Sequence, residues 1–152
     1  MVGKLLGIAT KPTKRAGMEL HESRIITFNG GLEGDHRGRG GLNRERQVTL
    51  LSVESWAEAC KELGAALDWT ARRANILIEG IAFNPTILNK WINFGDNVVL
   101  EVTGETKPCK RMDEVHFGLQ NALRNWRGGV CCRVIQGGFV RVGTNVEILT
   151  FE

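Results

Sequence analysis

The 152-residue sequence contains no tyrosine, only three prolines and no long apolar run. No stretch approaches the ~20 apolar residues that a membrane-spanning helix needs, so we expect no membrane partner. No proline- or serine-rich linker divides the chain, and its length is that of one ordinary domain, so we predict a single domain over residues 1–152. Hydrophobic residues make up 42% of the sequence and charged residues 24%, which is typical of a soluble domain.

The four cysteines lack the spacing of a metal site or of a disulfide framework. Cys60 and Cys109 are isolated, and the adjacent pair Cys131 and Cys132 would form a strained bridge. No C-x-x-C pair occurs, and the three histidines follow neither a zinc-finger nor an H-E-x-x-H pattern, so we expect no structural zinc. The first nine residues are interrupted by glycine and lysine and do not resemble a secretory signal. We therefore expect a cytoplasmic protein with free thiols.

The net charge of +3 is modest, but basic residues gather in local clusters. These clusters lie at residues 11–15, 37–46, 72–73 and 107–111. They favour the binding of small anions, although some of them will be ordinary solvated surface. A small basic barrel can also bind RNA without catalysis, but that function needs exposed aromatic side chains for base stacking. Because there is no tyrosine and most tryptophans are expected in the core, we do not expect a nucleic-acid partner.

Nineteen glycines and several short runs rich in β-branched residues predict a mainly β domain. We expect strands at residues 47–51, 75–78, 97–102, 130–135, 139–142 and 146–149, and also near 4–9 and 24–28. Residues 91–100 and 139–148 share a strand, glycine turn and strand, which predicts two similar hairpins in a barrel-like sheet. A further glycine turn at 136–138 predicts a C-terminal meander from 130 to 149.

Two segments have the apolar spacing of helices. Ser52 is a good N-cap for a helix that would end at Gly64 and bury an apolar stripe. The stripe comprises Val53, Trp56, Ala57, Cys60 and Leu63. A second helix is expected from Asp113 to Arg127, ahead of two consecutive glycines. It would bury Val115, Leu119, Ala122, Leu123 and Trp126.

The most unusual segment is the glycine-rich stretch at residues 30–41, which contains Asp35 and His36. Glycine lets the backbone approach a ligand closely, and these two side chains could then contact it. The stretch lacks the lysine and the following helical pattern of a phosphate-binding loop. A surface loop with Asp35 as an ordinary turn residue is the alternative interpretation.

A second candidate site is Cys109, which lies between Lys107 and the pair Lys110 and Arg111. Nearby cations and a helix N-terminus favour the thiolate form, which attacks sulfur or ligates a metal. Pro108 would make the turn that presents the thiol rigid. The alternative is a buried structural cysteine at a loop. We expect such a structural role for Cys131 and Cys132, with strand alternation turning them to opposite sides.

Several short motifs occur in one order over nearly the whole chain. They are Gly31-Leu32-Glu33-Gly34-Asp35, Arg46-Gln47-Val48-Thr49-Leu50-Leu51, Arg72-Arg73-Ala74-Asn75-Ile76-Leu77-Ile78, Gly95-Asp96, Pro108-Cys109-Lys110-Arg111-Met112 and Gly128-Gly129-Val130. Each motif alone is weak, but the ordered set is specific. In this set the chain resembles a short stand-alone member of the MOSC domain family, which is named for the C-terminal part of molybdenum cofactor sulfurase. The resemblance implies a mainly β fold, a partly open β-barrel with two or three short helices.

The resemblance also implies a pocket in which Cys109 meets the segment of Arg73 and Asn75 and the Gly-Asp loop. In larger relatives such as the amidoxime-reducing enzymes, the matching cysteine ligates molybdenum and basic residues hold the pterin phosphate. In short members the implied role is sulfur carriage, in which a cysteine desulfurase dependent on pyridoxal phosphate loads a persulfide onto the thiol. The chain departs from the larger enzymes in having no room for their N-terminal β region, which argues against tight cofactor binding. It also carries Thr144 at a turn where relatives often have an acidic residue.

Our hypothesis is that Cys109 is the nucleophile of a sulfur carrier, or the ligand of molybdenum if that metal or its cofactor is bound. The residues expected to bind an anionic ligand are Arg73, Asn75, Lys107, Arg111, Asp35, His36 and Lys14. The expected partners are the desulfurase and an anionic small molecule or metal-sulfur acceptor. The alternative is a molybdenum-cofactor-binding oxidoreductase that reduces N-hydroxylated compounds, so the question of enzymatic activity stays open.

Overall fold

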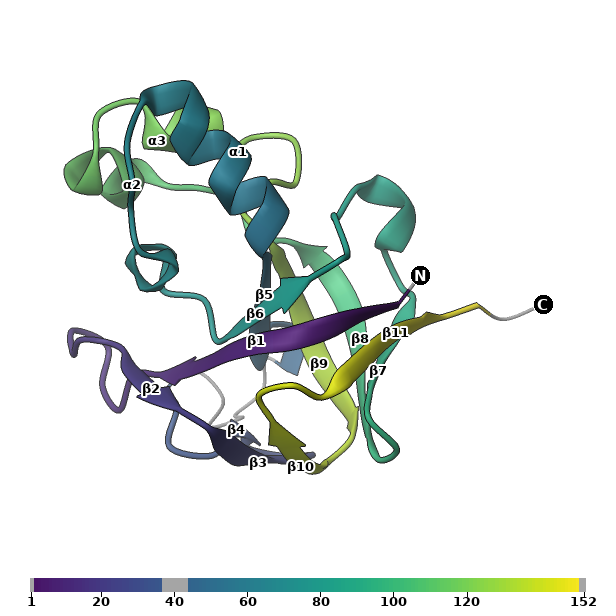
Figure 1. Ribbon diagram of the computed structural model, residues 1–152. Coiled ribbons are helices and arrows are strands. Elements are labelled where there is room, and N and C mark those ends of the chain that lie inside the picture. The colour runs from purple at the N-terminus through teal and green to yellow at the C-terminus, as the bar shows by residue number, and fades with distance from the viewer. Residues whose placement is uncertain (1, 37–43, 151–152) are drawn as a thin grey trace.

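The computed structural model describes residues 2–36 and 44–150, which form a mainly β structure with short helices gathered at one end (Figure 1). The strands are β1 (Val2–Thr10), β2 (Glu19–His21), β3 (Ser23–Thr27), β4 (Gly31–Leu32), β5 (Val48–Ser52), β6 (Ile76–Glu79), β7 (Trp91–Phe94), β8 (Val98–Glu105), β9 (Val130–Gln136), β10 (Gly138–Arg141) and β11 (Asn145–Leu149). The α-helices are α1 (Val53–Leu63), α2 (Lys110–Val115) and α3 (Leu119–Ala122), and the 3-10 helices are η1 (Arg44–Arg46), η2 (Trp69–Arg72) and η3 (Pro85–Ile87).

Seven strands form a closed barrel in the order β11-β7-β8-β9-β5-β6-β1, and β2 extends the sheet beside β1. The ring closes because β1 also pairs with β11, from Val2 opposite Glu147 to Lys4 opposite Asn145. The expected mainly β barrel is confirmed, but the barrel is closed rather than partly open. Closure gives both end strands a hydrogen-bonded neighbour and so leaves no free edge between them.

The inside of the barrel is apolar because alternate residues of each strand point inward. In β8 these residues are Val98, Leu100 and Val102, all of them buried. Cys132 of β9 joins this core, whereas its neighbour Cys131 points to the other side of the strand and is covered there. The barrel core is therefore separate from the layer that covers its outer face.

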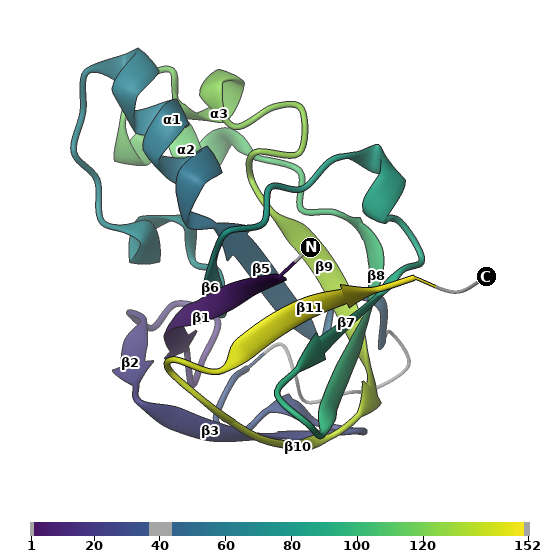
Figure 2. The same ribbon diagram turned by 45° about the vertical axis from the view of Figure 1, so that its right-hand side comes forward.

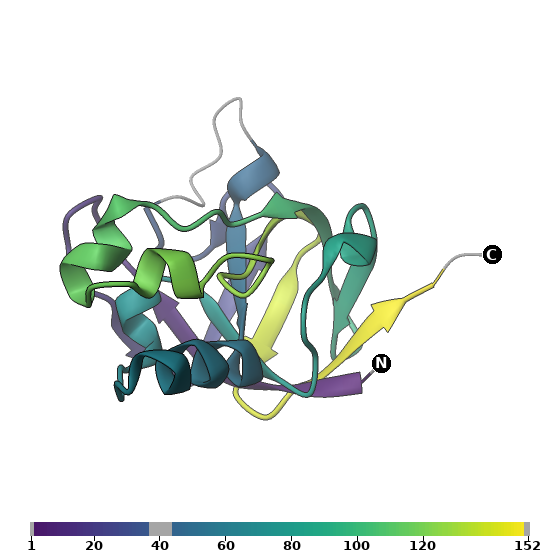
Figure 3. The same cartoon turned by 90° about the horizontal axis from the view of Figure 1, so that it is seen from above.

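The helices pack over the outside of the barrel at one end, as the view from above shows (Figure 3). The first helix is confirmed: the Ser52 hydroxyl accepts a hydrogen bond from the Ser55 N–H, and Gly64 ends α1 with a φ of 62°. Trp56 and Cys60 are buried as expected, but Ala57 faces solvent. The helices make a second apolar cluster against the outer side of β5 and β6. None of the helices in the described residues is long and apolar enough to cross a membrane.

The single helix expected from 113 to 127 is wrong, because the segment forms α2 and α3 with a break between them. Gly118 adopts a φ of 92° at the break, and the Asp113 carboxylate accepts a hydrogen bond of 2.9 Å from the Gln120 N–H. Beyond α3, Asn125 and Trp126 also have positive φ values. Leu119, Ala122 and Leu123 are buried as expected, whereas Val115 is exposed.

The C-terminal strands exist as expected, but their pairing does not follow the expected meander. β7 and β8 form a hairpin around Gly95. The second expected hairpin is wrong, because β10 pairs with β3 in a separate sheet of order β10-β3-β4, while β11 pairs with β7 and β1. This small sheet lies at the end of the barrel away from the helices (Figure 2). The cavity that contains Cys109 lies at the opposite end, beside the helices.

Candidate functional site: a basic cavity beside Cys109

A cavity of about 280 Å³ lies between the barrel and the helical layer. Its wall combines the β1–β2 loop, η1, β5, η2 and the residues after it, the segment after β8, the start of α2 and Gly128. The charged side chains that line it among the described residues are Lys14, Arg46, Arg72, Arg73, Lys107 and Arg111. No carboxylate stands among them. Cations gathered without carboxylates attract and hold anions, so the cavity is suited to a small anionic ligand.

Cys109 contributes the one thiol in the described wall of this cavity, and its side chain is exposed. The residue occupies the N-cap position of α2 with an extended backbone, but its side chain makes no capping hydrogen bond. The segment that leads to it is anchored where the Thr106 N–H donates to the Gly129 carbonyl at 2.9 Å. Gly129 has a φ of 102°, and a side chain there would collide with the Leu50 carbonyl. The fold thus presents the thiol to the cavity instead of using it as a cap.

Arg72 supports the segment that leads to Cys109, and it was not predicted from the sequence as a site residue. Its guanidinium is buried and donates to the carbonyls of Gly128 at 3.0 Å and Thr106 at 2.8 Å. The guanidinium also lies 3.9 Å from the Met112 sulfur. One side chain therefore joins η2 to the segment after β8, to the segment before β9 and to α2. The sequence signal was the double arginine, of which only the second residue was chosen.

The short helix η2 places both arginines. The N–H and the hydroxyl of Thr70 donate to the Asp68 carboxylate at 2.9 and 2.6 Å, and these hydrogen bonds lower the pKa of Asp68. Arg73 follows η2 with a φ of 65°, a conformation that non-glycine residues adopt only when the surroundings hold them there. Its guanidinium donates to the Ala16 carbonyl and so holds the loop that carries Lys14. The Nε atom of Arg73 is buried and has no hydrogen-bond partner in the described part of the chain.

The sequence profile of the MOSC domain matches residues 30–147. The chain belongs to the MOSC domain family. Among solved structures, the YuaD protein from Bacillus subtilis is similar with a TM-score of 0.85 and 19% identity, over 100% of this chain and 98% of that one. The YiiM proteins from Geobacillus stearothermophilus and Escherichia coli are similar with TM-scores of 0.69 and 0.68 and 14% identity each. The alignments cover 97% and 98% of this chain and 73% and 71% of the YiiM chains. At these identities the likeness shows the shared fold, and no curated protein matches the sequence significantly.

In this MOSC domain, five of the residues expected at the site line one cavity: Cys109, Arg73, Lys107, Arg111 and Lys14. Lys14 reaches it from the β1–β2 loop. The structure therefore brings together residues as far apart in the chain as Lys14 and Arg111.

Asn75 lies outside the cavity wall, and its side chain is already engaged. Its amide oxygen accepts hydrogen bonds from the N–H and hydroxyl of Thr49, at 3.0 and 3.3 Å, and its amide nitrogen donates to the Ala9 carbonyl at 3.2 Å. Thr49 itself lines the cavity. Asn75 thus holds β1 and β5 together and fixes Thr49, a wall residue, instead of lining the cavity itself.

Asp35 and His36 also lie outside the wall of the Cys109 cavity. The buried Asp35 carboxylate accepts a hydrogen bond of 2.9 Å from the Lys11 N–H, and the His36 N–H donates to the Lys11 carbonyl at 2.7 Å. These contacts fix the start of the loop that carries Lys14. The remainder of the expected glycine-rich stretch, residues 37–41, lies outside the described residues.

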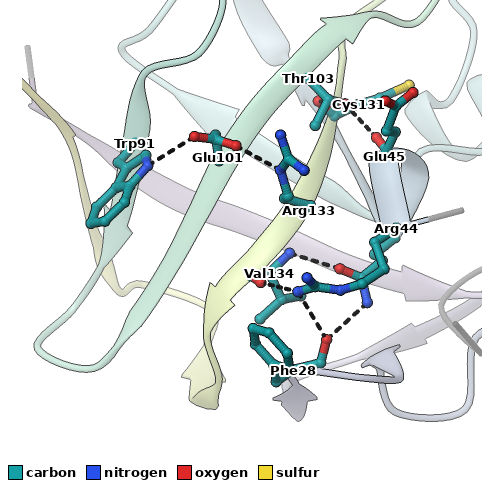
Figure 4. Close-up of polar contacts among 10 residues, drawn as sticks. Phe28, Arg44, Glu45, Trp91, Glu101, Thr103, Cys131, Arg133 and Val134 are labelled. Carbon is teal, nitrogen blue, oxygen red and sulfur yellow. Dashed lines mark hydrogen bonds and ion pairs between the residues drawn. The ribbon is translucent and has the colours of Figure 1, made fainter.

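Arg46 and the wall hydroxyls of Thr49 and Thr106 were not predicted at the site, although Arg46 lies in a basic cluster and Arg46 and Thr49 share one of the ordered motifs. Arg46 belongs to η1, which is fixed by its neighbours: Arg44 donates to the Val134 carbonyl at 2.6 Å, and the Thr103 hydroxyl donates to the Glu45 carbonyl (Figure 4). The same view shows the Glu101–Arg133 ion pair, 2.6 Å long, on the outer face of the barrel. These contacts between distant segments decide which arginine of a basic cluster reaches the cavity.

The described residues contain no group of three or more histidine, cysteine, aspartate or glutamate side chains that could hold a metal ion. The other cysteines do not add to the site. Cys60 lies in the helical core, Cys132 lies in the barrel, and the Cys131 sulfur is 3.3 Å from the Thr106 hydroxyl. Among the described cysteines, Cys109 is therefore the one that lines this cavity, with cations beside it.

Proposed function

We propose that this MOSC domain is a sulfur carrier that holds a persulfide on Cys109. The observation that carries the proposal is an exposed thiol in the wall of a cavity whose described charged side chains are all basic. A persulfide is an anion at its outer sulfur when deprotonated, and cations close to it favour that form. The proposal rests on this geometry together with membership of the family.

The donor is the persulfide of a cysteine desulfurase dependent on pyridoxal phosphate. The Cys109 thiolate attacks the outer sulfur of that persulfide, and a new S–S bond forms at Cys109. The S–S bond of the donor breaks, and its electron pair leaves with the donor cysteine, which takes up a proton. In delivery, a nucleophilic atom of the acceptor, an anionic small molecule or a sulfur ligand of a metal-sulfur centre, attacks the outer sulfur and forms a new bond to it. The S–S bond at Cys109 breaks, and its electron pair restores the Cys109 thiolate.

The residues of the chain contribute position and charge. Lys107 and Arg111 flank Cys109 and would hold the negative outer sulfur, while Lys14 lines the same cavity from the β1–β2 loop. Arg72 fixes the Thr106 carbonyl and so the segment that carries the thiol. We place the reaction in the cytoplasm, where reducing conditions keep cysteines as thiols.

The same wall supports a second candidate, a molybdenum-cofactor-binding oxidoreductase that reduces N-hydroxylated compounds. The donor set fits in kind, because Cys109 offers a thiolate ligand and Arg46, Arg73 and Lys14 offer partners for a phosphate. When bound, the cofactor would supply a redox-active metal. The volume of about 280 Å³ is close to the lower end of the roughly 300–1,000 Å³ of pockets that enclose small-molecule ligands.

The test compares the wild type with Cys109→Ser after incubation with the desulfurase and L-cysteine. Mass spectrometry of the intact protein should find one added sulfur atom on the wild type and none on Cys109→Ser, while Cys131→Ser serves as a matched control and keeps the label. A Cys109→Ser protein that carries the label at full stoichiometry would show the assignment to be wrong. Elemental analysis for molybdenum and pterin fluorescence of the purified protein separate the two candidates.

A further inference from the structure

A second hollow opens beside the Cys109 cavity, with a volume of about 400 Å³. The two share Lys14, Arg73, Arg111 and Met112, so they adjoin, with the Cys109 cavity as the inner part and the second hollow as the outer part. We call the outer part the outer groove. It is bounded by the β1–β2 loop on one side and by α2 on the other, with the residues after η2 between them.

The outer groove is basic, though less uniformly than the inner cavity. Arg15 joins Lys14, Arg73 and Arg111 in its described wall, and Glu114 is the one carboxylate among them. Lys14, Arg15 and Arg111 are exposed, so their charges are available to an arriving surface. Four cations against one carboxylate leave the groove complementary to acidic side chains.

An apolar anchor stands at the end of α2. Val115 lines the outer groove and is 43% exposed, and Phe117, two residues later, is 87% exposed. Burial of such an exposed aromatic side chain by a partner lowers the free energy of the complex. Aromatic anchors beside charged rims are typical of protein interfaces. The helix break at Gly118 keeps Phe117 out of the helical core, because α3 starts again only at Leu119.

We propose that the outer groove and Phe117 together dock an acidic segment of the protein that donates sulfur to Cys109. This inference rests on the proposed sulfur-carrier function. A persulfide on another protein must come within bonding distance of the Cys109 sulfur, so the donor has to cover the mouth of the cavity. The outer groove shares three cations with that cavity and therefore lies under any donor that reaches the thiol. The positive charge steers an acidic donor toward the mouth, and Phe117 holds it there.

The test measures the initial rate at which Cys109 gains a persulfide from two donors. One donor is the cysteine desulfurase of the same organism with L-cysteine, and the other is inorganic polysulfide, which is too small to need a docking surface. Phe117→Ser and Arg15→Glu should each slow loading from the desulfurase by about tenfold or more, since truncation of an interface anchor commonly costs that much. Phe117→Ser should load from polysulfide at the wild-type rate, because Phe117 is uncharged and lines neither hollow, whereas Arg15→Glu should slow anionic polysulfide far less than it slows the desulfurase, because Arg15 does not line the inner cavity. Phe139→Ser is the matched control, since Phe139 is also exposed, at 56%, but lies on β10 at the other end of the barrel.

Two outcomes overturn the docking surface alone. One is equal loading of wild type, Phe117→Ser and Arg15→Glu from the desulfurase while polysulfide still labels Cys109. The other is loss of binding to anionic lipid vesicles or to an RNA oligonucleotide in the two variants with unchanged loading from the desulfurase. If neither donor places a persulfide on wild-type Cys109, the sulfur-carrier function fails and the inference falls with it.

Discussion

Cys132 and Cys109 show how differently two regions of this MOSC domain treat the same side chain. Cys132 lies inside the barrel with an exposed fraction of 0%, and burial raises the pKa of its thiol well above the ordinary value, with Cys131 and Glu101 adding to the effect. Cys109 lies outside the barrel, exposed in the wall of the basic cavity. A thiol that keeps its proton is a poor nucleophile, so Cys132 is unsuited to the nucleophilic role that we propose for Cys109.

The difference teaches that the barrel and the cavity depend on different interactions. The barrel is held by apolar packing and by a closed ring of strand pairing. The cavity wall is held by side chains that reach across loops to backbone carbonyls, such as the two hydrogen bonds of Arg72. Substitutions in the barrel should therefore change stability without changing the reactivity of Cys109. Arg72, which contacts both regions, is the expected exception.

The largest effect on stability is expected from Leu100→Ala in the barrel core. Removing most of a buried leucine side chain commonly lowers the free energy of unfolding by about 2–5 kcal/mol. Because Leu100 does not line the cavity, the rate at which Cys109 reacts with iodoacetamide in the folded protein should stay unchanged. Urea unfolding and the alkylation rate test the two halves of this expectation.

Leu88→Ala is the matched control for that substitution, because Leu88 is exposed and its truncation should change stability little. A Leu100→Ala protein that folds but has an altered Cys109 alkylation rate would break the separation between barrel and cavity.

Arg72→Lys tests the side chain that joins the two regions. Lysine keeps the charge but lacks the planar fork that bonds the Gly128 and Thr106 carbonyls together. We expect the free energy of unfolding to fall by about 1.5–3 kcal/mol, the range for hydrogen bonds of charged groups, and persulfide loading of Cys109 to slow as well. Arg111→Lys, at an exposed position of the same cavity, should leave stability nearly unchanged. If Arg72→Lys slowed loading without any loss of stability, the arginine would not be the joint between barrel and cavity.

The sequence predicted the parts of the fold that depend on local patterns. The strands alternate as expected, and α1 follows from its cap at Ser52 and its stop at Gly64. The errors concern pairing over distance: β10 and β11 look like a hairpin locally, but β10 bonds to β3 and β11 closes the ring with β1. Strand pairing depends on packing across the whole barrel, so a local turn motif does not predict which strands pair.

The candidate site shows the same limit. Cys109 stood out because cations flank it in sequence, and two of them, Lys107 and Arg111, line the same cavity. Asn75 was selected by its motif, yet its amide is used to hold Thr49. Arg72 was passed over because a buried arginine cannot be told from an exposed one without knowing which carbonyls it meets. Those carbonyls belong to Thr106 and Gly128, which are distant in sequence and come close to Arg72 only in the folded chain.

Alkaline pH should lower the free energy of unfolding through the buried Cys132 thiol. Below about pH 8.5, the ordinary thiol pKa, Cys132 keeps its proton in both the folded and the unfolded chain and adds no pH dependence. Above it, the unfolded chain loses this proton while burial keeps it on the folded protein, because the folded pKa is raised. The free energy of unfolding should then fall by up to about 1.4 kcal/mol per pH unit from this group, until the folded pKa is reached.

Urea unfolding of wild type and Cys132→Ala from about pH 8 to about pH 10 measures this slope. The variant should be less stable throughout but should lose less stability per pH unit. Because the chain has no tyrosine, phenol ionisation does not contribute in this range. Equal slopes in the two proteins would mean that Cys132 is not shielded as the barrel core implies.

The smallest expected effect is that of Thr106→Val in the cavity wall. The Thr106 hydroxyl lies 3.3 Å from the Cys131 sulfur, and the S–H of Cys131 can donate to it, which leaves the O–H free to donate to an anion in the cavity. Valine has nearly the same shape, so only this donor is lost, at a cost of about 0.5–1.5 kcal/mol in the affinity for sulfate as a probe anion. Isothermal titration calorimetry with sulfate measures the change, and Thr106→Ser should retain wild-type affinity because it keeps the hydroxyl. Equal sulfate affinity in Thr106→Val and the wild type would show that charge alone, without the neutral wall donors, determines what the cavity binds.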